Sequence, residues 1–75
     1  MYSFCQLREI AVELRKQYPV GTKVRLVNMD DTQAPPIGTL GVVKGVDDTA
    51  SLLVSWETGS SLSVLYGVDV VEKVD

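Results

Sequence analysis

The sequence predicts a mainly β domain that is preceded by one amphipathic α-helix. Two observations support this prediction. Residues 19–75 contain five short runs rich in valine and leucine, and turn residues separate most of them. Residues 3–18 instead carry apolar side chains at steps of three and four, the spacing of a helix face. Because one long loop comes early and tight turns follow, we expect a small five-stranded SH3-like barrel at residues 19–75 and a helix at residues 1–18, together forming one domain.

The N-terminal segment has the start and stop signals of a helix. Ser3 and Gln6 have capping-box spacing, and Arg15 and Lys16 suit the negative end of the helix dipole. Pro19 ends the helix. The predicted apolar stripe comprises Phe4, Leu7, Ile10, Ala11, Leu14 and Tyr18. We favour packing of this stripe across one mouth of the barrel, and a dimer seam is the alternative.

The five runs predict five strands in order. They are residues 23–27, 38–46, 52–56, 60–65 and 70–74. Within them, Val24 and Leu26 should face inward, and Gly45 indicates a bulge. Residues 28–38 form the long loop, and residues 47–50 form a tight turn in which aspartates hydrogen-bond the backbone.

Length and composition limit the class of protein. Seventy-five residues are near the lower limit for a domain without a disulfide or metal, so we expect a homo-oligomer. The single cysteine, Cys5, favours a reducing cytoplasm. We expect no signal peptide, and no apolar run reaches the roughly 20 residues of a membrane span.

Charge argues against duplex nucleic acid as a partner. The net charge is −3, and the acidic excess lies in residues 19–75. Proteins that follow phosphate backbones usually carry a basic stripe. Only a local patch of Lys23, Arg25 and Lys44 supports a nucleic-acid-binding accessory barrel. An acidic chain is better suited to a basic protein surface or to a small ligand in a local pocket.

The sequence does not support catalysis. It contains no histidine, and Cys5 has no evident base beside it. Adjacent carboxylates occur at residues 30–31 and 47–48, but neighbours on a strand point to opposite faces and do not form an acid–base dyad. Neither pair has the ligand pattern of a calcium loop. We therefore expect no catalytic residues, no metal ligands and no cofactor.

The long loop is the main candidate for a binding surface. Met29, Gln33, Pro35 and Pro36 combine apolar surface with polar groups, a mixture that is typical of ligand pockets. For Asp30 and Asp31 we favour a solvated turn over contact with a ligand, although both remain candidates.

Five further residues complete the predicted site. Trp56 is equally suited to core packing and to a stacking wall, and Tyr66 is the other candidate for stacking. Ser60 and Ser61 lie either on an exposed strand face or in a row of hydroxyls that donates to a ligand. Arg25 could pair with a phosphate, but a solvated charge on the strand is the simpler interpretation.

Several segments carry a family resemblance. They are Pro19–Val27, Met29–Asp31, Gln33–Thr39 and Val54–Leu62. They resemble a family of small uncharacterised proteins from phages, plasmids and conjugative elements, mostly of Gram-positive bacteria. The resemblance covers residues 19–73, so the helix is expected to lie outside it. It implies a location in the cytoplasm of a bacterial host cell and a counter-defence role.

This setting leads to three hypotheses, none of them enzymatic. The first is a homo-oligomer that sequesters a nucleotide-derived host immune signal in a pocket walled by the long loop. The second is an acidic inhibitor that docks on the basic surface of a host defence nuclease. The third is the nucleic-acid-binding accessory barrel.

Overall fold

Helix α1 (Phe4–Gln17) begins at the predicted capping box. The computed structural model describes residues 3–74, except for the side chain of Phe4. Residues 1, 2 and 75, which belong to the predicted helix and barrel ranges, lie outside the described residues. Ser3 Oγ accepts the Gln6 N–H at 3.2 Å, and Gln6 Oε1 accepts the Ser3 N–H at 2.8 Å. The capping box and the helix are therefore confirmed.

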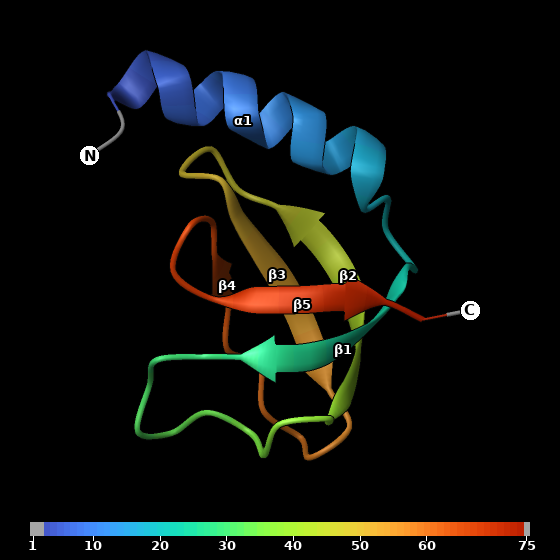
Figure 1. The fold of residues 1–75 in the computed structure, drawn as a ribbon. Coiled ribbons are helices and arrows are strands. Elements are labelled where there is room, and N and C mark those ends of the chain that lie inside the picture. Colours follow the sequence, from blue (N-terminus) through green and yellow to red (C-terminus); the bar gives the residue numbers. More distant parts are fainter. Residues whose placement is uncertain (1–2, 75) are drawn as a thin grey trace.

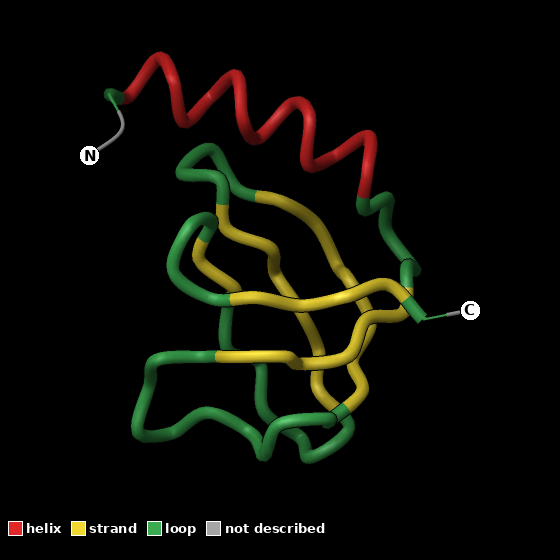
Figure 2. Tube along the Cα trace, viewed as in Figure 1, coloured by secondary structure: helices red, strands yellow, loops and turns green. Residues whose placement is uncertain are grey.

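Five strands form one antiparallel sheet that curls into a barrel-like shape (Figures 1 and 2). They are β1 (Lys23–Asn28), β2 (Leu40–Val46), β3 (Ser51–Trp56), β4 (Val64–Leu65) and β5 (Val70–Lys73). Their order across the sheet is β4-β3-β2-β1-β5. This arrangement confirms the predicted mainly β class. The register shift between Val43 and Gly45 confirms the predicted bulge.

The fourth strand is much shorter than predicted. Residues 60–63 are not extended partners of β3, because the chain curls under the Trp56 side chain. The Trp56 backbone N–H donates to Ser60 O at 2.9 Å, and its indole Nε1–H donates to Leu62 O at 3.0 Å. The bond to Leu62 satisfies the buried indole N–H. After this curl, only Val64–Leu65 pairs with β3 as a strand.

The core fills the inside of the sheet and reaches α1. Its buried apolar residues are Ala11, Leu14, Val24, Leu26, Val43, Val46, Ala50, Leu52, Val54, Trp56 and Val64. Ala11 and Leu14 come from α1, so the favoured packing of the helix against the barrel is correct for this part of the stripe. Figure 1 shows α1 lying across the end of the sheet at the β2–β3 turn.

A charged clamp holds the helix over that turn. The Arg15 guanidinium donates to Val46 O at 2.9 and 3.2 Å, and it forms an ion pair with Asp48 at 3.2 Å. The exposed ion pair contributes little, whereas the hydrogen bonds to the carbonyl fix the direction in which α1 crosses β2.

The β2–β3 turn is closed by Asp47. Its Oδ1 accepts the N–H groups of Thr49 and Ser51, each at 3.0 Å, and the Thr49 hydroxyl at 2.7 Å. These bonds support the positive φ of +62° at buried Ala50, a conformation that costs an alanine about 1–2 kcal/mol. Partial burial raises the pKa of Asp47, but the three hydrogen bonds and the Arg15 charge outweigh it and hold the pKa below its ordinary value of 3.8.

Gly41 allows β2 and β3 to pack closely. A Cβ at this position would lie 2.6 Å from Val54 Cγ1 and 2.7 Å from Trp56 Cε3. At Gly45, in the same strand, the nearest atom would be 3.8 Å away. The space that a side chain would occupy at position 41 is therefore filled by the core.

The substitution Gly41→Ala should destabilise the fold by about 1–3 kcal/mol, because the new methyl group overpacks against Val54 and Trp56. Urea denaturation measures the free energy of unfolding. Gly45→Ala is the matched control and should change it by no more than about 0.5 kcal/mol. Equal effects of the two substitutions would contradict the packing argument.

The Asp47 turn should make stability depend on pH below about 4. A carboxyl with a lowered folded pKa stabilises the fold above its ordinary pKa of 3.8, and this contribution is lost as pH falls through the folded pKa. Asp47→Asn keeps one oxygen acceptor but does not ionise. Urea denaturation between pH 6 and roughly pH 2 should therefore show a stability difference between the two proteins that shrinks in acid. A difference that is constant with pH would contradict this account.

Candidate functional site

The predicted binding loop is held firmly against the barrel. Asp31 Oδ1 accepts the Gln33 N–H at 2.8 Å, and Pro36 O accepts both the N–H and the hydroxyl of Thr39. Pro35 is buried and Met29 packs partly against the core. Most of the loop nevertheless faces solvent, and its exposed residues include Asp30, Asp31, Thr32, Gln33, Pro36 and Ile37.

Two predicted ligand contacts have internal partners. Trp56 is only 2% exposed and its indole N–H is satisfied by Leu62, so of its two interpretations the structure shows core packing. The Arg25 guanidinium forms an ion pair with Glu72 of β5, in which Nε donates to Oε1 at 2.7 Å. Arg25 is thus a paired strand charge, and the Trp56 ring has no open face for stacking.

The predicted site residues do not converge on one pocket. Ser60 and Ser61 follow β3 at the end of the molecule that lies away from α1, as does the long loop (Figure 1). Ser61 is exposed, and the carbonyl of Ser60 is occupied by Trp56. Tyr66 is the one predicted residue that lines the pocket described next.

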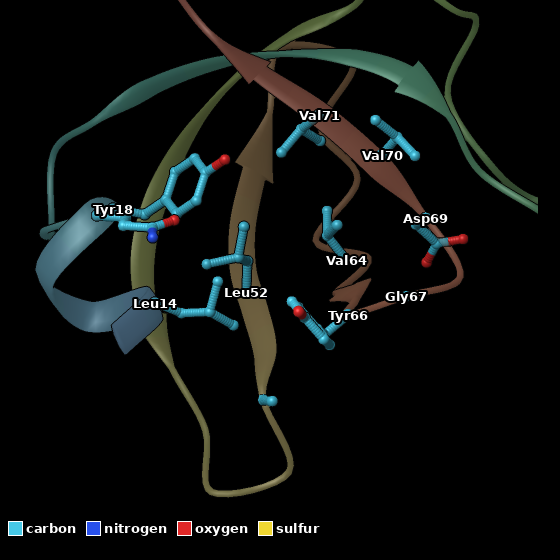
Figure 3. A pocket seen from close by; sticks show the side chains of 11 residues that line it. Leu14, Tyr18, Leu52, Val64, Tyr66, Gly67, Asp69, Val70 and Val71 are labelled. Carbon is cyan, nitrogen blue, oxygen red and sulfur yellow. The ribbon is translucent and has the colours of Figure 1, made fainter. Parts of the chain in front are cut away.

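An apolar pocket of about 280 Å³ lies between the end of α1 and the β4–β5 connector (Figure 3). Leu14, Leu52 and Val64 converge at its base, where all three are buried. The complete lining is Leu14, Gln17, Tyr18, Ala50, Leu52, Val64, Tyr66, Gly67, Asp69, Val70 and Val71. No lysine or arginine is among these eleven residues, all of which the structure describes.

A second pocket of about 290 Å³ adjoins the first one. It is lined by Glu9, Ile10, Glu13, Leu14, Gln17 and Tyr66. The two pockets share Leu14, Gln17 and Tyr66, so together they form one depression along α1, which we call the α1 groove. No sequence pattern indicates the groove, because it forms where a helix face meets a connector that is distant in the chain.

The connector beside the groove exposes apolar side chains. Four large apolar side chains within six consecutive residues are each 44–52% exposed: Leu65, Tyr66, Val68 and Val70. Scattered exposed apolar residues are ordinary, but a cluster beside an open pocket is typical of a binding surface.

Asp69 ties the connector to the long loop. Its Oδ2 accepts the Leu65 N–H at 3.0 Å, and its Oδ1 accepts the Asp30 N–H at 3.1 Å. The two bonded residues are 39 positions apart, and no local sequence pattern indicates such a bond. The carboxylate fixes one wall of the groove and anchors the start of the loop.

Metal chemistry finds no support among the residues described. No group of three or more histidine, cysteine or acidic side chains within residues 3–74 is placed to hold a metal ion. Cys5 is exposed and does not line the pocket at the end of α1. Within the same range, no helix is long and apolar enough to cross a membrane.

Comparison with known families gives one match. A family model described as a domain of unknown function (DUF4314) matches residues 7–74. Because this range includes most of α1, the expectation that the helix lies outside the family resemblance is wrong. No curated protein and no solved structure matches this chain.

Replacing Asp69 by alanine should release the start of the long loop. Because two backbone N–H groups lose a charged acceptor, we expect a loss of about 1–3 kcal/mol in stability and faster amide hydrogen exchange at Asp30 and Leu65. NMR-detected exchange measures both sites. Asp31→Ala is the control, because Asp31 bonds only within its own turn, to Gln33. Unchanged exchange at Asp30 in Asp69→Ala would contradict the anchoring role.

Proposed function

The chain belongs to the DUF4314 family, and we propose that it acts by binding a protein partner, without catalysis. The pocket at the end of α1 carries this proposal, because it is apolar, open to solvent and edged by exposed apolar side chains. Pockets of this kind accept the large apolar anchors that supply most of the energy of protein interfaces.

Charge favours a basic partner. The described residues that line the two pockets of the α1 groove include three carboxylates, Glu9, Glu13 and Asp69, and no lysine or arginine. An acidic surface steers a basic partner toward it and repels acidic ones. We therefore propose that the partner presents an apolar side chain flanked by lysine or arginine.

The pocket is less suited to a nucleotide-derived signal. Tyr18 and Tyr66 could stack on a base, but phosphates need cations or free N–H donors. The Lys73 ammonium lies 5.1 Å from the Tyr18 ring centroid and Arg25 pairs with Glu72, but neither residue lines either pocket of the groove. Sequestration of a nucleotide is therefore the weaker of the two proposals.

The strand order supports a finer description of the fold, as an SH3-like barrel. A β4-β3-β2-β1-β5 sheet with a long β1–β2 loop is what we expect of an SH3-like barrel. In the mobile-element setting implied by the sequence resemblance, the partner would be a host defence nuclease whose basic surface is masked. Masking requires only that the protein stays bound to the nuclease, so it needs no catalytic group.

A short flexible peptide with one leucine between lysines should bind in the pocket at the end of α1. The expected NMR shift changes centre on Tyr66 and Val70, and they should weaken as salt rises. Val70→Ser should lower affinity by about three- to tenfold, because Val70 lines the pocket. Val68→Ser is the matched control, since Val68 is equally exposed but does not line the pocket.

Two outcomes would overturn the proposal. One is equal binding of a peptide in which glutamates replace the lysines. The other is saturable binding of a cyclic nucleotide that raises the melting temperature while the lysine peptide has no effect.

A further inference from the structure

We infer that the α1 groove binds an amphipathic α-helix of the partner, with two apolar side chains one turn apart and a basic flank. This inference rests on the proposed protein-binding function and specifies the local structure of the bound segment. Three observations carry it: the double pocket, the charge on its rim, and the hydrogen bonds of its outer wall.

The double pocket has the spacing of helix anchors. Ile10, Leu14 and Gln17 lie on one face of α1 at steps of four and three, and the two pockets open along this face. From Glu9 to Gln17 the helix rises about 12 Å, a little over two turns. The residues of α1 that line the second pocket span 9–17, and those of α1 and its C-cap that line the first span 14–18, so the two pockets are offset along the helix by about one turn. A second helix packed alongside presents side chains i and i+4 about 5–6 Å apart, which suits one anchor in each pocket.

The rim of the second pocket complements basic side chains. Glu9 and Glu13 line it, and no lysine or arginine does. Among the residues that the structure describes, Glu13 pairs with Lys16 at 3.7 Å, and both side chains are more than 60% exposed. Such a pair contributes little, so a partner's lysine or arginine can replace it at small cost.

The outer wall disfavours an extended strand as the occupant. Adding a strand requires free backbone N–H groups along the edge it joins. In the connector, the N–H of Leu65 donates to Asp69 Oδ2, and the N–H groups of Val68 and Asp69 donate to Leu65 O. These donors are already used, whereas the apolar side chains of this wall remain exposed. The wall therefore contacts a partner through side chains, as a helix does.

A set of designed peptides tests the inference. The probe is an alanine-based peptide with leucines at i and i+4 and lysines on the adjacent positions, labelled for fluorescence anisotropy. We expect it to bind at least about tenfold more tightly than a peptide of equal composition with leucines at i and i+2. A central proline should cause a similar loss, and circular dichroism should show helix formation on binding.

Charge reversal on the protein locates the site. Glu13→Lys should weaken binding of the probe about tenfold, because an attraction becomes a repulsion. Glu57→Lys is the matched control, because it changes the net charge equally but lies on a turn that lines neither pocket of the groove. It should change the affinity for the probe by less than about twofold. Both positions are exposed, so folding is retained and is checked by thermal melts.

The outcomes separate this inference from the proposed function. If the short flexible lysine–leucine peptide binds and the helical probe binds no better than its i, i+2 and proline controls, the helix inference is wrong and the protein-binding function stands. If neither peptide binds, both are wrong. If Glu13→Lys and Glu57→Lys lower the affinity for the helical probe equally, the α1 groove is not its binding site.

Discussion

The close approach of Trp56 to Gly41 is the constraint on which the rest of the structure depends. The indole ring fills the space that a side chain at position 41 would need, and this draws β2 and β3 together. Once the indole is buried, its N–H requires an acceptor, and Leu62 O provides it. The chain after β3 must therefore curl inward, which leaves β4 only two residues long. Val64, the first residue of this short strand, lies at the base of the open pocket.

Local features of the fold could be predicted because they depend on residues near one another in sequence. The Ser3–Gln6 capping box and the helix stripe follow from spacing alone, and the Gly45 bulge follows from a glycine within a valine-rich run. The length of β4 could not be predicted, because it is set by how the buried Trp56 finds its acceptor. Alternating residues in 60–65 are compatible with a strand until that requirement is known.

The candidate site was harder to predict than the fold. The composition of the long loop is that of a pocket wall and predicts binding there, but its exposed polar residues Asp30, Asp31 and Gln33 line neither pocket of the α1 groove. Tyr66 was predicted, and it alone of the candidates lines the groove. Asp69 was missed, since its bond to Asp30 joins segments that only the folded sheet brings together. Sequence composition indicates what a loop can do, while the hydrogen-bond network decides which groups remain available.

Helix α1 has two roles that share one face. Ala11 and Leu14 are buried and complete a core that 75 residues could otherwise barely supply, while Ile10 stays partly exposed above the second pocket. A face that is only partly covered by its own barrel has apolar area left for a partner. A partner that covers this area removes more apolar surface from water. Because it would bind only the folded chain, it would also stabilise the folded state by mass action. For so small a domain, the incomplete packing of α1 both limits the core and provides the surface on which the proposed binding depends.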